Sequence, residues 1–207
     1  MWLVAKQNAA MCNITLGLST PPSGWSCSSL SSLCTSWSGV SCVSGYVIGI
    51  DFSTSNLNGT LSASIGQLNQ LQSLIIQNSG LRGTIPSEIG NASSLSYLVI
   101  SHSSANGTLP SSIGKLTGLT NLELSYNCLS GTIPTELGKL SQLSSLELNC
   151  NLLTGSIPSE TFSLTHLQAI KLRGNSLGST ISPNIGSLIN VVEIEFSFNC
   201  LTGLVPF

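Results

Sequence analysis

Hydrophobic residues recur in a fixed 24-residue pattern from Val47 to the end of the chain, without an insertion or a deletion. With the positions of each unit numbered 1 to 24, apolar residues hold positions 1, 4, 6, 11, 15, 19 and usually 22. The units begin at Val47, Leu71, Leu95, Leu119, Leu143, Leu167 and Val191. A strict period of this length is typical of a solenoid, in which each unit buries its apolar face only against its neighbours. We therefore predict one elongated domain.

Each unit is predicted to contain one strand. Apolar positions 4 and 6 alternate with polar positions 3, 5 and 7, which is the periodicity of a strand with one face turned inward. Strands that recur in step must run parallel, with neighbours about 4.8 Å apart. Position 9 holds an amide or a hydroxyl that can satisfy backbone groups inside the stack. The later units have Asn127, Asn151, Asn175 and Asn199 there, and the earlier ones have Ser55, Ser79 and Ser103.

Glycine and proline mark the turn that follows the strand. Position 13 is glycine in six units, where a bend is easiest without a Cβ atom. Position 16 is proline in five units: Pro86, Pro110, Pro134, Pro158 and Pro206. Because proline interrupts a regular helix, we expect the back of each coil to be irregular or briefly 3-10 helical. We expect local slack where Ala92, Ala105 and Ser179 replace the usual residue.

The combined pattern, L-x-x-L-x-L-x-x-N-x-L-x-G-x-I-P-x-x-I/L-G-x-L, resembles the plant-type leucine-rich repeat. The resemblance covers residues 47–207, which we divide into seven repeats, the last one incomplete and without a carboxy-terminal cap. It implies an α/β solenoid that is right-handed, with a parallel concave sheet and an irregular or 3-10 convex side. Because the chain stops midway through a unit, we expect it to be part of a longer array.

Residues 1–46 do not repeat, and they resemble the amino-terminal cap of that family. The segment Cys34-Thr-Ser-Trp-Ser-Gly-Val-Ser-Cys42 is similar to the cap motif C-x-W-x-G-V-x-C, with one extra residue before the tryptophan. The resemblance implies a Cys34–Cys42 disulfide, worth about 2–3 kcal/mol through the entropy of the denatured state, and a short helix within residues 1–20. We expect Cys12 to pair with Cys27, and Cys27–Cys34 is the competing pairing.

Composition narrows the possible partners. Only 7% of residues are charged and the net charge is −2, so no basic surface is available for nucleic acid. No apolar run reaches the roughly 18 residues that a membrane span requires, and the first ten residues are too short for a secretory signal. We therefore expect that the signal was removed or that the chain is a fragment. Four of the seven cysteines cluster in residues 1–46 and three lie within the repeats, and the cluster indicates an oxidising, extracellular or cell-surface location.

The concave sheet is the predicted binding surface, because a solenoid displays columns of side chains there. Ile75, Tyr97 and Val99 predict an apolar patch flanked by aromatic residues, and acidic and basic residues follow in later units. We predict these contacts with a protein or peptide ligand: Tyr97, Val99, His102, Glu123, Tyr126, Glu147, Lys171 and Arg173. The simpler interpretation is that any seven-strand face exposes a few such residues, and that its charges form solvent-screened pairs.

The sequence argues against an enzyme. His102 and His166 are the two histidines, and they fall at positions 8 and 24, on opposite sides of the coil. No glycine-rich phosphate loop and no cysteine spacing of the zinc type is present. We therefore expect no catalytic residues, no metal and no cofactor.

A uniform hydroxyl column at position 14 gives an alternative function. It contains Thr60, Thr84, Thr108, Thr132, Ser156 and Thr180. A rigid row of hydroxyl and methyl groups spaced near 4.8 Å can order water and adsorb to ice, and some plant antifreeze proteins are similar to leucine-rich-repeat inhibitors. The simpler reading is that threonine suits a half-exposed extended edge.

The sequence as a whole resembles an extracellular recognition module. We expect a receptor-like ectodomain, or a soluble protein similar to polygalacturonase inhibitors, that serves signalling or defence and binds a protein or peptide on its concave face. Such a protein can be membrane-tethered in a longer product. Four glycosylation sequons are present, at Asn13, Asn58, Asn91 and Asn106.

Overall fold

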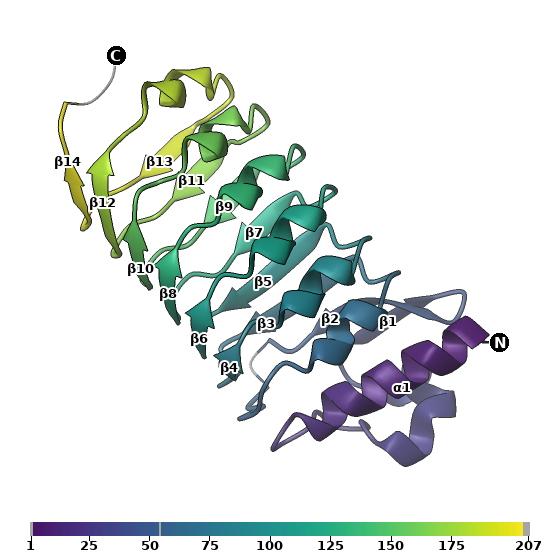
Figure 1. Cartoon of the computed structure of the whole chain (residues 1–207). Coiled ribbons are helices and arrows are strands. Elements are labelled where there is room, and N and C mark those ends of the chain that lie inside the picture. Colours follow the sequence, from purple (N-terminus) through teal and green to yellow (C-terminus); the bar gives the residue numbers. More distant parts are fainter. Residues whose placement is uncertain (1, 54, 205–207) are drawn as a thin grey trace.

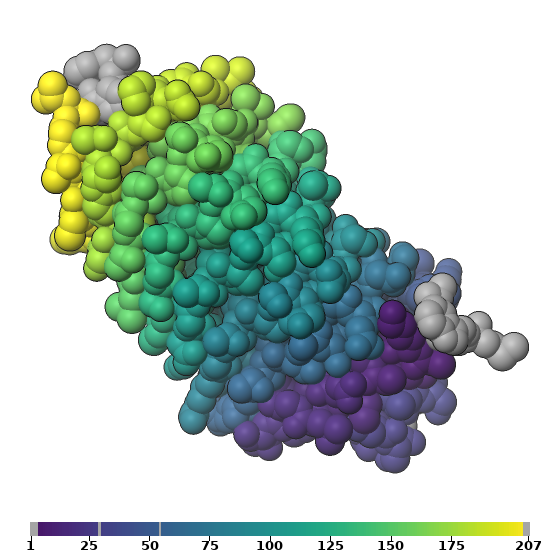
Figure 2. Space-filling view, in the orientation of Figure 1, coloured from purple at the N-terminus to yellow at the C-terminus, as the bar shows by residue number. Residues whose placement is uncertain are grey.

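The protein is an elongated stack of coils in the computed structural model, which describes residues 2–53 and 55–204 (Figure 1). Figure 2 shows the coils as successive bands across the long molecule. Residues 1, 54 and 205–207, which include the predicted Pro206, lie outside the described part. Among the described residues, no helix has the length and apolar character needed to cross a bilayer.

Two helices, a 3-10 turn and a hairpin precede the regular coils. These elements are α1 (Trp2–Leu16), η1 (Cys27–Ser32), α2 (Leu33–Ser36), β1 (Val40–Val43) and β2 (Tyr46–Asp51). Helix α1 lies along the first coil at one end of the stack (Figure 1). It forms because residues 2–16 contain neither proline nor glycine, and it buries Met11 and Ile14 against the coil. The helix that the resemblance implied within residues 1–20 is present.

Two disulfides tie these elements together. Cys34 is bonded to Cys42 and Cys12 to Cys27, with Cα atoms 5.6 and 5.0 Å apart, so the competing Cys27–Cys34 pairing does not form. The rings of Trp25 and Trp37 lie 4.6 Å apart, and Trp25 also meets the ring of Phe52 in the first coil at 4.9 Å. The hydrophobic core therefore continues without interruption from this region into the coils.

The concave side is an eight-stranded sheet in the order β1-β2-β3-β5-β7-β9-β11-β13. The hairpin β1–β2 is antiparallel and the other neighbours are parallel, in the predicted 24-residue register, so that Leu74 lies beside Leu98 and Leu98 beside Leu122. The remaining strands are β3 (Ser73–Gln77), β5 (Tyr97–Ser101), β7 (Asn121–Glu123), β9 (Ser145–Glu147), β11 (Ala169–Lys171) and β13 (Glu193–Glu195).

A second parallel sheet, which the sequence analysis missed, covers the flank after position 9 (Figure 1). Its strands are β4 (Arg82–Thr84), β6 (Ser104–Thr108), β8 (Cys128–Thr132), β10 (Leu152–Gly155), β12 (Ser176–Thr180) and β14 (Cys200–Thr202). Residues that pair in this sheet are 22 positions apart in the sequence, so Thr108 lies beside Ser130 and Thr132 beside Thr154. The predicted row of position-14 residues spaced at 4.8 Å is therefore wrong, because each of these threonines has a position-12 residue as its direct neighbour.

Short 3-10 turns form the convex side, as predicted. They are η2 (Ala63–Gln67), η3 (Ser87–Asn91), η4 (Ser111–Lys115), η5 (Thr135–Lys139), η6 (Ser159–Ser163) and η7 (Pro183–Ser187). Proline stands immediately before four of these turns, with φ between −71° and −60°. Ser62 and Ser182 take its place in the other two, where each hydroxyl accepts a backbone N–H of the turn. Both residue types thus start the turn by a local mechanism.

The buried asparagines join consecutive coils. The Asn127 amide donates to Ile100 O in the preceding coil at 2.7 Å, and the Asn151 amide donates to Leu124 O at 2.9 Å. Their Oδ1 atoms accept the backbone N–H groups of Ala105 and Leu129. The position-9 side chains therefore satisfy backbone groups inside the stack, as expected from their chemistry. The slack expected at Ala92 and Ala105 does not expose them, because both are fully buried.

Candidate ligand-binding face

Position 8 forms the rim of the concave face, and its backbone adopts a conformation that was not predicted. Its φ angle is left-handed in every described unit, between 49° and 67°, although most of these residues are not glycine. The non-glycine members are Asn78, His102, Tyr126, Cys150 and Phe198. This conformation costs roughly 1–2 kcal/mol in an L-residue, so the repeat imposes it. His102 and Tyr126 stack as a result, with ring centroids 4.2 Å apart and planes 14° apart.

The aromatic half of the face lies on β5 and at the ends of β5 and β7. Tyr97 is 40% exposed and Tyr126 is 49% exposed, which is unusual for large apolar groups and fits a contact surface. Val99 is a correction to the prediction, because it is only 3% exposed. Its short side chain lies between the longer Ile75 and Glu123 on the neighbouring strands. Val99 supports this surface from below and does not itself face a ligand.

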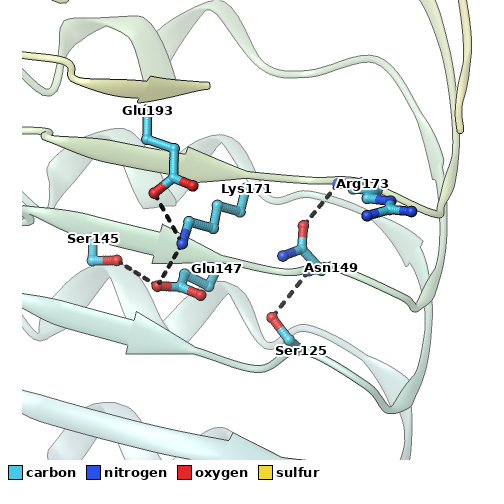
Figure 3. Close-up of polar contacts among 7 residues, drawn as sticks. All are labelled: Ser125, Ser145, Glu147, Asn149, Lys171, Arg173 and Glu193. Atoms are coloured by element: carbon cyan, nitrogen blue, oxygen red, sulfur yellow. Dashed lines mark hydrogen bonds and ion pairs between the residues drawn. The ribbon is translucent and has the colours of Figure 1, made fainter. Parts of the chain in front are cut away.

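The charged half of the face is centred on Lys171 (Figure 3). Its Nζ atom lies 3.0 Å from Glu193 Oε2 and 3.8 Å from Glu147 Oε1. The hydrogen bond with Glu193 raises the pKa of Lys171, burial opposes the rise, and the charge of Glu147 adds to it. The ammonium group therefore stays charged at neutral pH. Glu147 was predicted as a ligand contact and lies beside Lys171, whereas Glu193 at position 3 was not among the predicted residues.

Arg173 is held differently. Its guanidinium lies 4.9 Å above the ring of Phe198. Its backbone N–H donates to Asn149 Oδ1 at 2.8 Å (Figure 3). Ser125 Oγ accepts the Asn149 N–H at 3.2 Å, which continues the chain of contacts into the preceding coil. Phe198 is 73% exposed and was not among the predicted contacts. Arg173 and Phe198 thus form a second exposed cation–aromatic element of the face.

Negative charge is concentrated on this surface. Within the described residues, its strands and their ends carry five carboxylates and two basic groups, the second of which, Arg173, lies just beyond β11: Asp51, Glu123, Glu147, Glu193, Glu195, Lys171 and Arg173. The net charge of the whole chain is −2, so the rest of the molecule is slightly positive. Among described residues Glu123 has no ion pair. The face therefore favours cationic ligands over anionic ones.

The flank sheet carries the position-14 hydroxyl column and one sequon. All six column residues are exposed. The methyl group of each threonine faces the position-13 glycine of the next coil, and a Cβ atom on Gly131 would lie 3.0 Å from Thr108 Cγ2. Asn106 is exposed on the same sheet. Of the other sequon residues, Asn13 donates to Ser64 Oγ and Asn58 donates to Asn56 Oδ1, and Asn91 is exposed on the convex side.

The two histidines lie apart, as expected. His102 is in the aromatic stack, whereas His166 Nδ1 lies 2.9 Å from Ser141 O on the opposite side of the coil. Cys128, Cys150 and Cys200 are free thiols.

Known proteins of the same kind share this architecture. A family model described as a leucine-rich repeat region matches residues 52–171. The crystal structure of PEPR1-AtPEP1 is similar over 97% of this chain and 29% of that chain, with 28% identity and a TM-score of 0.92. The ectodomain of the Arabidopsis receptor kinase HAESA, in complex with an IDA peptide hormone ligand, is similar over 100% of this chain and 43% of that chain, with 29% identity and a TM-score of 0.61. A plant ice-binding protein is similar over 95% of this chain and 72% of that chain, with 27% identity and a TM-score of 0.82. The chain thus spans less than half the length of the first two.

Proposed function

Because the chain belongs to the leucine-rich-repeat family, we propose that it is an extracellular recognition module that binds a peptide or protein on its concave face. In this proposal residues 1–46 cap the array and residues 47–207 form the repeats. The module belongs to a receptor-like or inhibitor-like protein of signalling or defence. The observation that carries the proposal is the exposed aromatic and charged surface on the eight-stranded sheet. HAESA, which has the same fold, is known in complex with a peptide hormone.

The mechanism is binding without a chemical step. The sheet is preformed, so the protein loses little conformational entropy when a ligand binds across it. Exposed aromatic groups supply most of the energy in such interfaces, and here they are Tyr97, Tyr126 and Phe198. The remaining proposed contacts are His102, Glu123, Glu147, Lys171 and Arg173. The two disulfides fit an oxidising extracellular location.

The Tyr126→Asn variant tests this face. Asparagine occupies the same position in the second unit as Asn78, with a left-handed φ of 51°, so the backbone accepts the change. We expect the affinity for a partner captured from extracellular fluid to fall at least tenfold, because a central aromatic contact is lost. The measurement is surface plasmon resonance with the captured partner. Lys139→Ala on the convex side is the control and leaves binding unchanged. Equal binding by Tyr126→Asn and the wild type would place the ligand elsewhere.

Ice binding is the second candidate function. It is supported by the exposed hydroxyl column and by the likeness to a plant ice-binding protein. Among the described residues, no protein group hydrogen-bonds the column hydroxyls, so they are available to order water. The 22-residue register makes the array two-dimensional, because each of the five position-14 threonines has a position-12 residue as its neighbour.

An ice recrystallisation assay tests this candidate. We expect the wild type to keep ice crystals small and Thr132→Lys to lose the effect, because a long, strongly hydrated cation disrupts the array around Thr154. Tyr126→Asn is the control and keeps full activity. Growth of large crystals with the wild-type protein eliminates the candidate.

A further inference from the structure

A cavity of about 330 Å³ opens on the concave face where the β1–β2 hairpin meets β3. Its lining includes Ser41, Ile48, Gly49, Asp51, Ser73 and Ile75. The volume lies at the lower end of the range for pockets that enclose small ligands, which is also suitable for a single large side chain. The cavity lies beyond the aromatic half of the face, at the amino-terminal end of the sheet.

Two glycines create this cavity. Gly49 occupies position 3, where the next two units have Ser73 and Tyr97, so β2 contributes no side chain here and the small Ser41 side chain of the hairpin lies 3.4 Å from where a Cβ atom would stand. Gly39, with φ of 77°, brings the hairpin close to β2, because a Cβ atom there would lie 2.1 Å from Asp51 O. The Asp51 N–H donates to Gly39 O at 2.8 Å and fixes this approach. The close approach of the hairpin to β2 is therefore fixed by the backbone.

The lining combines apolar walls with one carboxylate. Ile48 and Ile75 are half-buried, whereas Asp51 is exposed. Asp51 Oδ1 accepts the Ser53 N–H at 2.8 Å. Within the described residues Asp51 has no ion pair, and the two basic groups of this face lie at its far end, in the sixth unit. A side chain with an aliphatic stem and a cationic head satisfies both parts of such a site.

We propose that this cavity is the subsite for a lysine or arginine side chain of the bound peptide. The stem lies between Ile48 and Ile75, and the head pairs with Asp51. The inference rests on the proposed peptide-binding function and extends it, because it names a basic residue and places that residue at the amino-terminal end of the sheet. The excess of carboxylates over bases on the whole face favours the same partner.

Titration of ¹⁵N-labelled protein with N-acetyl-arginine methylamide, followed by NMR, tests the subsite directly. We expect saturable shifts of the amide signals of Gly49, Asp51 and Ser53 with millimolar affinity. The same probe built on lysine should give the same shifts. N-acetyl-citrulline methylamide, which has nearly the same shape and no charge, should bind about five- to tenfold more weakly, because the ion pair is lost. Equal shifts with the citrulline probe, or no shifts with arginine, overturn the proposal.

Asp51→Asn is the matched variant, because an asparagine Oδ1 still accepts the Ser53 N–H and preserves the turn. We expect it to bind the arginine and citrulline probes equally weakly. Glu136→Gln on the convex side is the control and keeps the wild-type preference. Unchanged discrimination by Asp51→Asn would also overturn the proposal.

The two hypotheses fail in different ways. If Tyr126→Asn weakens partner binding while the arginine probe causes no shifts, the result supports binding on the concave face and contradicts the basic subsite. If Tyr126→Asn has no effect on partner binding, the result contradicts the proposed function itself.

Discussion

Replacement of Asn151 by alanine is expected to lower the free energy of unfolding by about 3–5 kcal/mol. The side chain is buried and connects two coils: its amide donates to Leu124 O at 2.9 Å and to Leu148 O at 3.2 Å, and its Oδ1 accepts the Leu129 N–H at 3.0 Å. Alanine leaves these backbone groups buried without a partner, and each unsatisfied group costs about 1–3 kcal/mol. Urea denaturation followed by circular dichroism measures the change.

Asn190→Ala is the matched control for this prediction. Asn190 is exposed and makes one hydrogen bond, to Thr165 O at 2.7 Å, so we expect a loss below about 1 kcal/mol. Equal losses for the two variants would contradict the structural role of the buried amide.

Asn151→Asp separates the donor from the acceptor. The carboxylate still accepts from Leu129 but faces the carbonyls of Leu124 and Leu148, and burial raises the pKa of such a group. A raised pKa means that the folded state binds the proton more tightly than the unfolded state does. Stability relative to the wild type therefore falls as the pH rises through that raised pKa. We expect the variant to be closer to the wild type at pH 4 than at pH 7.

The features of the fold that could be predicted are local and repeated. The inward residues follow from the 24-residue period, the amide ladder follows from the chemistry of Asn127 and Asn151, and the 3-10 turns follow from the prolines that precede them. The pairing of Cys12 could not be predicted from local sequence, because Cys27 lies within reach of both Cys12 and Cys34 along the chain. The position of α1 against the first coil decides it, and that is a tertiary property.

The flank sheet could not be predicted in the same way. Its register is 22 residues although the sequence period is 24, because the strands after position 9 are offset by two residues from one coil to the next. That offset is a property of the stack and has no signal within one unit. The same holds for the left-handed conformation of position 8, where Tyr126 and Phe198 are residue types that rarely adopt it.

The binding face was predicted in part. Tyr97, His102, Tyr126 and Glu147 lie on the concave strands or their rim, as the strand periodicity indicated. Val99 has the same periodicity but is covered, because exposure depends on the length of the neighbouring side chains. Glu193 and the subsite at Gly49 depend on contacts between units. Such contacts cannot be predicted from the residues that occupy one position of the repeat.

Close packing of the convex turns depends on glycine at position 20 of the unit. In four consecutive coils a Cβ atom at this position would lie between 2.1 and 2.6 Å from its nearest atom in the next coil. These glycines are Gly66, Gly90, Gly114 and Gly138. None has a left-handed φ, so steric space and not backbone freedom requires glycine here. Gly186 occupies the same position in the last turn, where nothing lies within 4 Å of the added atom.

Gly114→Ala is therefore expected to destabilise the protein by about 2–3 kcal/mol, because the added methyl group would lie 2.4 Å from Glu136 O and the η4 and η5 turns must move apart. Gly186→Ala places the same methyl group in open space, and we expect it to leave stability unchanged or to raise it by up to about 1 kcal/mol through the denatured state. The local sequences match closely, since an isoleucine precedes each glycine and a leucine follows two residues later. Helix propensity therefore cancels in the comparison, and the difference between the two urea midpoints measures contact between coils alone. Similar midpoints for the two variants would show that the turns do not pack as closely as the structure requires.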